Sequence, residues 1–258
     1  MTSVQKLFVL LCGYEIVPFS LCLRGGGDRF VMSVPISAYL LETREGLVIF
    51  DTGFDSSLLR DAEERKKHFE AHGWETPVVW PQHEMLDQLG QIGAAPADIR
   101  HVILSHAHFD HTGNLKHFPR AKVWMQEAER DYAFADPPHL GVLRHDFDDP
   151  DIDWCWVDGD HEIMPGLKLV ATHGHTPGHQ SALVTLPETG TAVLVGDVGD
   201  WLQNFDEEIL PGEVSDDVKA LESIRRINGL RRDLNATLFV GHDPYLIQTQ
   251  RLAPDFYT

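Results

Sequence analysis

Five short apolar runs in this chain each lead directly into a cluster of polar side chains. The runs cover residues 47–50, 101–105, 167–172, 191–195 and 237–240. Runs of this length are typical of buried strands, and apolar residues recur at helical spacing between them, for example over 81–92 and 214–227. Alternating strands and helices predict the α/β class, in which polar loops at strand ends often carry the functional residues.

The remaining elements follow from the same patterns. Further strands are expected over residues 6–11, 30–34, 36–42, 121–125 and 182–186. Helices are expected over 57–72, where Gly73 provides a stop, and over 127–135. The Asp-rich segment 137–153, which also contains proline, is expected to form an excursion or lid.

Composition excludes several classes of function. The 258 residues include 21 Lys and Arg against 40 Asp and Glu, a formal charge of −19, so nucleic acid is not an expected partner. No apolar run approaches the roughly 18 residues of a membrane span. The cysteines Cys12, Cys22 and Cys155 form no CxxC pair, which favours a reducing compartment and a cytoplasmic location. The hydrophobic content of 43% is that of a folded domain.

The strongest local signal is His106-x-His108-x-Asp110-His111, directly after the run at 101–105. A tight loop after a strand lets alternate side chains converge on one point. A divalent ion accepts imidazole nitrogen and carboxylate oxygen there at about 2.0–2.2 Å. The alternative is a solvated histidine-rich loop, which three histidines and an aspartate at this spacing make the less favoured interpretation.

Three later strand ends add the candidate ligands His179, Asp197 and His242. Seven ligands exceed the needs of one ion, whereas two ions about 3.5–4 Å apart and sharing a carboxylate would use them all. The predicted sets are His106, His108 and His179 for one ion, Asp110, His111 and His242 for the other, and Asp197 as the bridge. His173 and His175 are interpreted as loop residues. The set lacks cysteine, so Zn²⁺, Fe²⁺, Mn²⁺ and Co²⁺, which accept nitrogen and oxygen ligands, all remain candidates, and Zn²⁺ is the expected ion.

These residues resemble the metallo-β-lactamase superfamily. The HxHxDH motif of that family stands at 106–111, and its third histidine, bridging aspartate and last histidine are matched by His179, Asp197 and His242. The likeness extends from the Asp51-Thr52-Gly53 turn to the last of these histidines. It implies an αββα sandwich, in which two mixed β-sheets are flanked by helices, and a single hydrolase domain over residues 1–258.

Within the superfamily, the chain is similar to the N-acyl-homoserine lactonases, which are quorum-quenching enzymes. The likeness rests on residues 99–105 before the motif and on residues 175–181 around the third histidine. It implies a dinuclear hydrolase that opens a lactone ring by attack of a metal-bridging hydroxide on the carbonyl, with Asp110 as the catalytic proton shuttle. The chain departs from the pattern at Asp200, where those lactonases commonly place a tyrosine that hydrogen-bonds the substrate carbonyl.

Other functions remain open at this point. An ester or thioester metallohydrolase similar to glyoxalase II, a di-iron redox protein or a binding module without activity could keep the same ligands. The expected partner is a small-molecule lactone or ester, and the resemblance leaves a homodimer through the N-terminal region open. Asp51 is expected to hydrogen-bond a ligand histidine. The candidate aromatic walls of a substrate pocket are Phe19, Trp74, Trp80, Phe109, Trp154 and Trp156.

Overall fold

The computed structural model describes residues 2–258 and contains two mixed β-sheets. The first has the strand order β1–β2–β3–β4–β5–β6, with the bounds Val4–Pro18, Val31–Thr43, Gly46–Phe50, Ile99–Ile103, Lys122–Gln126 and Asp153–Val157. The second has the order β11–β10–β9–β8–β7, with the bounds Thr237–Phe239, Gly190–Leu194, Gln180–Leu186, Leu167–Ala171 and His161–Met164. Strands β1 to β3 pair antiparallel and β3 to β6 pair parallel. In the second sheet β10 and β11 are parallel and the other pairs are antiparallel.

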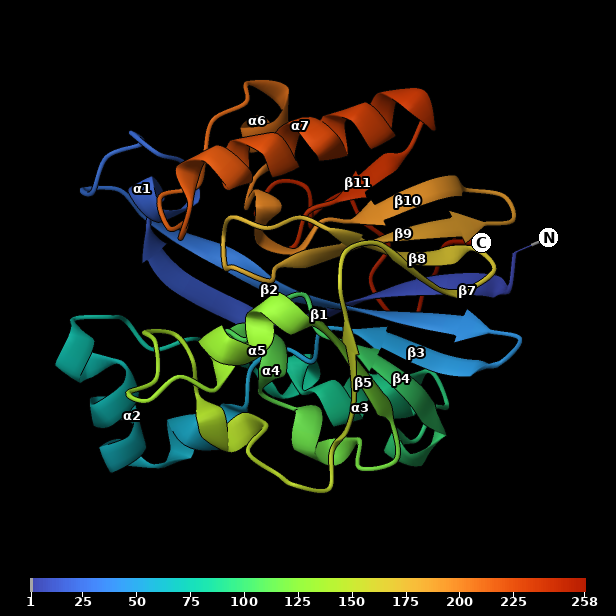
Figure 1. Cartoon of the computed structure of the whole chain (residues 1–258). Helices are drawn as coiled ribbons and strands as arrows, with labels where there is room; N and C mark the ends of the chain where they lie inside the picture. The colour runs from blue at the N-terminus through green and yellow to red at the C-terminus, as the bar shows by residue number, and fades with distance from the viewer. Residues whose placement is uncertain (1) are drawn as a thin grey trace.

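Helices cover the outer face of each sheet. Their bounds are Phe19–Cys22 (α1), Ala62–His68 (α2), Met85–Gln91 (α3), Phe109–Thr112 (α4), Glu127–Ala133 (α5), Leu202–Asp206 (α6) and Asp217–Asp233 (α7). In Figure 1, α6 and α7 lie above the second sheet and α2 to α5 lie below the first. The layers therefore run helix, sheet, sheet, helix, which confirms the predicted αββα sandwich. None of the described helices is both long and apolar enough to cross a membrane.

Strand β2 illustrates how the first sheet is buried on both faces. Ile36 and Leu40 join the apolar cluster between this sheet and its helices, whereas Tyr39 and Leu41 join the cluster between the two sheets. Successive side chains of a strand point to opposite faces, so β2 contributes side chains to both clusters. Because both faces are buried, residues 38–41 form a continuous apolar run rather than an alternation of apolar and polar residues.

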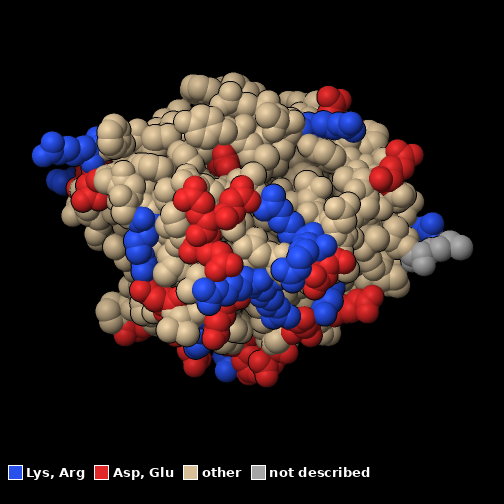
Figure 2. Space-filling view, turned by 90° about the horizontal axis from the view of Figure 1, so that it is seen from above, with Lys and Arg blue, Asp and Glu red and all other residues tan. Residues whose placement is uncertain are grey.

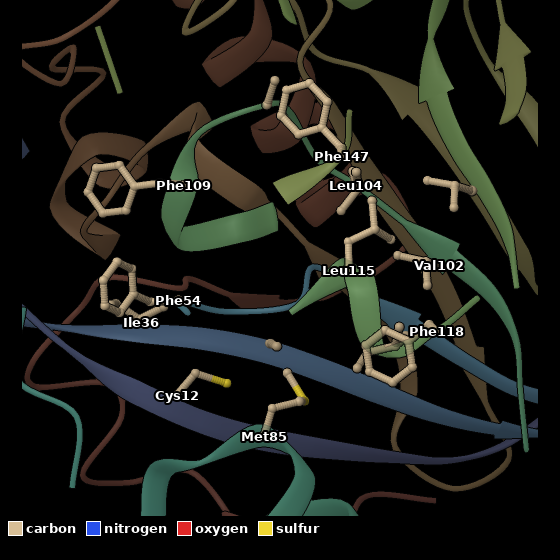
Figure 3. Close-up of a cluster of buried hydrophobic side chains, with 14 of the residues drawn as sticks. Cys12, Ile36, Phe54, Met85, Val102, Leu104, Phe109, Leu115, Phe118 and Phe147 are labelled. Atoms are coloured by element: carbon tan, nitrogen blue, oxygen red, sulfur yellow. The ribbon is translucent and has the colours of Figure 1, made fainter. Parts of the chain in front are cut away.

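The cluster under the first sheet also anchors the polar loop that follows β4. Phe109, within that loop, packs against Phe54 and Phe69 with ring centroids 5.7 and 5.6 Å apart, and Figure 3 shows the first of these contacts. Leu104 and Leu115, before and after the polar residues, belong to the same cluster. Close packing at both ends and in the middle therefore fixes the backbone of this loop.

Some elements differ from their predicted extent. The helix expected over 57–72 divides into a 3₁₀ turn, α2 and a second 3₁₀ turn, because the Asp61 side chain accepts hydrogen bonds from backbone N–H groups in the first turn of α2 and starts a new helix. The strands expected over 30–34 and 36–42 form the continuous strand β2, since both pair with β1. The segment 137–153 is an irregular excursion with one short 3₁₀ turn. Edge strand β7 has no counterpart in the prediction, because it begins with polar residues.

Candidate metal centre

Polar loops from both sheets meet at one edge of the molecule. The loop after β4 continues into α4 and contributes four side chains, the loop between β8 and β9 contributes one, and the ends of β10 and β11 contribute one each. The carboxyl ends of parallel neighbours such as β10 and β11 lie at the same sheet edge, which brings their loops together. The side chains that meet are His106, His108, Asp110, His111, His175, Asp197 and His242.

His106, His108, His175 and Asp197 form the first of two groups. The Nε2 atom of His175 lies 3.2 Å from Nε2 of His106 and 3.1 Å from Nδ1 of His108. The Oδ2 atom of Asp197 lies 3.5 Å from Nε2 of His175 and 3.7 Å from Nε2 of His106. Two nitrogens bound to one tetrahedral ion at about 2.0–2.1 Å are about 3.3 Å apart, so this group has the spacing of ligands around a single ion.

Asp110, His111 and His242 form the second group. The Oδ2 atom of Asp110 lies 3.0 Å from Nε2 of His111 and 3.5 Å from Nε2 of His242. The Oδ1 atom of Asp197 lies 3.3 and 3.4 Å from the same two nitrogens. Asp197 therefore presents one carboxylate oxygen to each group, which is the arrangement that a bridging ligand requires.

Two buried atoms of the cluster have no hydrogen-bond partner among the residues that the structure describes. They are Nε2 of His111 and Oδ1 of Asp197. A buried polar atom without a partner costs about 1–3 kcal/mol unless another interaction satisfies it. Metal coordination would satisfy both atoms, and six of the seven ligands predicted from the sequence lie in the two groups. The donor set therefore fits a dinuclear metal site.

His179 lies outside both groups, contrary to the prediction. Its Nδ1–H donates to the carbonyl oxygen of Thr172 at 3.0 Å, and its Nε2 accepts from the backbone N–H of Asp197 at 2.9 Å. Both ring nitrogens are thus occupied by protein groups. His175, interpreted from the sequence as a loop residue, places its Nε2 in the first group instead. No pattern in the sequence separates these two histidines, because both follow β8 in the same loop.

Hydrogen bonds from the protein orient the ligand histidines. Asp51 accepts from the Nδ1–H of His111 at 2.9 Å, which confirms the role expected for this aspartate. The Nδ1–H groups of His175 and His242 donate to backbone carbonyl oxygens at 2.9 and 2.8 Å. Each contact engages Nδ1 and so leaves Nε2 as the nitrogen that can bind a metal ion.

The two groups differ in their electrostatics. Burial, followed by the charge of His175, lowers the pKa of His108 to about 3, and burial likewise lowers the pKa of His106 well below its ordinary value. These imidazoles are neutral at pH 7, as metal ligands must be. Burial also opposes protonation of His242, but the charges of Asp197 and Asp110 outweigh it and raise the pKa to about 10.

Burial also opposes protonation of His111, but the charges of Asp110 and Asp197 outweigh it and raise its pKa well above the ordinary value. Metal binding is therefore expected to release about two protons from His111 and His242 at pH 7. His242 has a pKa of about 10 in the metal-free protein and carries a proton that an ion must displace from Nε2. Below that pKa, the apparent metal affinity should rise about tenfold per pH unit for each proton released. Calorimetric titration of the metal-free protein with Zn²⁺ in two buffers of different ionisation enthalpy measures this number. Equal heats in the two buffers would contradict a protonated His111 and His242 in the metal-free protein.

A cavity of about 360 Å³ opens over the two groups. The ligands that line it are His108, Asp110, His175, Asp197 and His242, and the apolar residues that line it include Ile16, Val17, Leu21, Phe69, Trp74 and Phe109. Two of the predicted aromatic walls, Trp74 and Phe109, are thus in place. Phe19 packs against Trp201 instead, and Trp154 and Trp156 stack on each other on β6. A partly apolar cavity with a polar floor suits a small molecule that has an apolar tail and a polar head.

Comparison with known proteins gives one family and a consistent set of relatives. The family model described as the metallo-beta-lactamase superfamily matches residues 33–242. The chain is 32% identical over 246 residues to the N-acyl homoserine lactonase AttM of Agrobacterium fabrum, which covers 91% of this chain and 90% of that protein. It is 28% identical over 254 residues to the N-acyl homoserine lactonase AiiA of Bacillus thuringiensis subsp. kurstaki, which covers 98% and 99% of the two chains.

A solved structure extends this likeness to three dimensions. It is an N-acyl homoserine lactone hydrolase with the product N-hexanoyl-L-homoserine bound at the catalytic metal centre. It superposes on this chain with a TM-score of 0.90 and 28% sequence identity, and the alignment covers 100% of both chains. The fold, the sequence and the position of the clustered ligands are therefore consistent with one another.

Proposed function

The chain belongs to the metallo-β-lactamase superfamily, and we propose that it is a dinuclear metallohydrolase that opens the lactone ring of N-acyl-homoserine lactones. One observation carries the proposal: two ligand groups share Asp197 beneath a cavity that has an apolar wall. The relatives named N-acyl homoserine lactonases support it, because they align over at least 90% of both chains.

The proposed ligand set follows the geometry rather than the sequence pattern. It assigns His106, His108 and His175 to one ion, Asp110, His111 and His242 to the other, and Asp197 to both. Nitrogen and oxygen donors without cysteine suit Zn²⁺, and Fe²⁺, Mn²⁺ or Co²⁺ could replace it. Bound divalent ions would polarise the lactone carbonyl and lower the pKa of the attacking water toward neutrality. Elemental analysis of protein purified without added metal tests this assignment, with two equivalents per chain expected.

Asp110 is proposed as the residue that moves a proton during the reaction. Its carboxyl group lines the cavity, and its Oδ2 lies 3.0 Å from Nε2 of His111. Burial raises the pKa of Asp110, but the charge of His111 outweighs this and lowers the pKa, so the group is ionised at pH 7. It can therefore accept a proton from the attacking water and pass it to the alkoxide oxygen that leaves when the ring opens.

The apolar residues of the cavity have a separate role in this proposal. Phe69, Trp74 and Phe109 line the cavity beside the metal ligands, and Phe109 is itself held by packing in the core. Their side chains would contact the acyl chain of the substrate and exclude water from it. Burial of apolar area contributes about 25 cal/mol per Å², so longer acyl chains should bind more tightly until the wall is covered.

We further propose a cytoplasmic enzyme consisting of one domain over residues 1–258. The three cysteines are free, which supports a reducing compartment. On the face seen in Figure 2, Lys and Arg side chains lie among Asp and Glu side chains, an arrangement that does not favour the phosphate backbone of a nucleic acid. A homodimer through the N-terminal region is also proposed, and the family resemblance is its support.

The zinc-loaded protein is expected to hydrolyse N-hexanoyl-homoserine lactone with a kcat/KM at least about 100-fold above that for S-lactoylglutathione, the thioester substrate of the alternative function. The apolar wall complements an acyl chain, whereas the carboxyl groups around the cavity repel the anionic glutathione. Chelation followed by dialysis should abolish lactone hydrolysis, and two equivalents of Zn²⁺ should restore it. Faster turnover of the thioester, or metal-loaded protein that opens no lactone, would overturn the proposal.

A further inference from the structure

The cavity over the metal centre is lined by carboxyl groups that the proposed ligand set does not use. Glu15, Glu75, Asp200 and Glu213 line it together with the ligand carboxyl groups of Asp110 and Asp197. Glu75 is exposed. Glu15, Asp200 and Glu213 interact electrostatically with the ligand residues and are called the three surplus residues below. Among the described residues that line this cavity, none is Lys or Arg. Glu15 and Asp200 are half-buried and Glu213 is exposed. An excess of one charge around a cavity selects ligands by their charge, so these three residues bear on which substrates can enter.

Two of the three surplus residues are attached directly to the loops that carry metal ligands. Asp200 follows the bridging Asp197 by three residues in the turn after β10. The backbone carbonyl of Glu213 accepts the hydrogen bond from Nδ1–H of His175 at 2.9 Å. The backbone of each residue is therefore fixed relative to a ligand, and each side chain reaches the cavity from its own side.

Glu15 approaches from the first sheet. It lies in β1 opposite Val34 of β2, and the next residue, Pro35, accepts the hydrogen bond from Nδ1–H of His242 at 2.8 Å. The strand that carries Glu15 is thus paired with the strand that holds a ligand of the second group. The three surplus carboxyl groups line the cavity from three separate segments of the chain.

These carboxyl groups and the ligands act on one another electrostatically. Burial, and next the charge of Asp110, raise the pKa of Glu15 to about 8 in the metal-free protein. Burial, and next the charge of Asp197, raise the pKa of Asp200 well above its ordinary value. Effects of this size arise when charged groups face a shared and poorly solvated space. Two divalent ions in that space would favour the ionised form of all three carboxyl groups.

The surplus carboxylates change the net charge that a substrate meets. Two divalent ions and two ligand carboxylates leave a net charge of about +2, which attracts anions of any kind. Three further carboxylates bring this net charge to about −1. An anionic substrate then loses its attraction to the site, while N–H groups of a substrate find strong acceptors.

We propose that Glu15, Asp200 and Glu213 determine the charge selectivity of this site, so that it rejects lactones whose acyl chain carries a negative charge. This inference rests on the proposed lactonase function and specifies which lactones are accepted. The apolar residues Val17 and Leu21 of the same cavity remain available for an uncharged acyl chain. A carboxylate at the end of that chain is therefore the feature that the site should reject.

The test compares two substrates that differ by one charge, N-butanoyl-homoserine lactone and N-succinyl-homoserine lactone, on the zinc-loaded enzyme. The wild-type protein is expected to prefer the uncharged substrate in kcat/KM by at least about tenfold. The triple variant Glu15→Gln, Asp200→Asn, Glu213→Gln keeps the side-chain sizes and removes the three charges. Its preference should fall by at least about tenfold. Glu162→Gln, at an exposed position of β7, removes a distant charge and should leave the preference unchanged.

The outcomes separate this inference from the proposed function. If zinc-loaded wild-type protein opens neither lactone, the proposed function is wrong. If it opens the butanoyl substrate, the inference is overturned either by equal rates on the two substrates or by a preference that the triple variant retains. The preference is a ratio within each protein, so a general loss of activity does not alter it. Should the triple variant fail to bind two zinc ions, the three single variants give the same test, and unchanged preferences in all three overturn the inference.

Discussion

Replacement of His175 by alanine is expected to lower kcat/KM for the lactone by about a thousandfold or more and to remove one metal ion. The Nε2 atom of His175 lies 3.1–3.2 Å from the ring nitrogens of His106 and His108, so its loss leaves one ion with two imidazoles and the shared carboxylate. A catalytic metal contributes several kcal/mol to the transition state, and about 4 kcal/mol corresponds to a thousandfold change in rate. Metal content and steady-state kinetics measure the two effects.

The matched variant is His179→Gln, in the same loop. Its side chain retains a hydrogen-bonding amide near Thr172 and the backbone N–H of Asp197, so both metal ions should still bind when zinc is saturating. The loss of activity should be about 10–100-fold, the usual effect of a residue that orients a ligand. Added imidazole should restore part of the activity to His175→Gly but none to His179→Gly. If the His175 variants keep both ions and His179→Gln loses one, the ligand of the first group is His179 rather than His175.

The candidate site was predictable where its ligands are close in sequence. The sequence around 106–111 concentrates histidines and an aspartate directly after a buried run, and their convergence needs only the local geometry of one loop. The structure places His179 outside the two ligand groups, for a reason that involves distant contacts. Its ring is engaged by Thr172 and by the backbone of Asp197, and the second contact exists only after β10 has paired with β9. Local sequence therefore locates the loop but does not decide which of its histidines, His175 or His179, joins the first ligand group.

The fold, too, was predictable where local sequence decides the structure and not where distant contacts do. Apolar runs predict β4, β5, β8 and β10 because strands buried on both faces need no information from their neighbours. The interruption at Asp61 depends on a side chain that caps the next helix, and propensity alone continues the helix through it. Glu15 gives no functional signal in the sequence, because it is a single acidic residue in a long strand. Pairing of β1 with β2 places it beside the segment that holds His242.

Glu129 of α5 joins the two loops that carry the first ligand group, and it gave no signal in the sequence either. One oxygen of its fully buried carboxyl group accepts from the backbone N–H of Ala107 at 3.0 Å. The other accepts from Oγ1–H of Thr176 and from the backbone N–H of Gly178, both at 2.8 Å. Ala107 lies between two ligand histidines, and Thr176 directly follows His175. A single carboxyl group therefore connects the loop after β4 to the loop after β8.

Glu129→Ala is accordingly expected to lower the free energy of unfolding by about 3–5 kcal/mol, because three buried donors lose their acceptor. Glu129→Gln keeps the shape but turns an NH₂ group toward donors, so its cost should be smaller, about 1–3 kcal/mol. Glu127→Gln, at an exposed position of the same helix, should change stability by less than about 0.5 kcal/mol. Urea unfolding of the zinc-free proteins measures these differences without the contribution of metal binding. Zinc titration of the folded Glu129→Gln protein should show about 10–100-fold weaker binding of one ion. If the Glu129 variants instead unfold at the same urea concentration as the wild-type protein and bind zinc with the same affinity, this carboxyl group does not hold the two loops together.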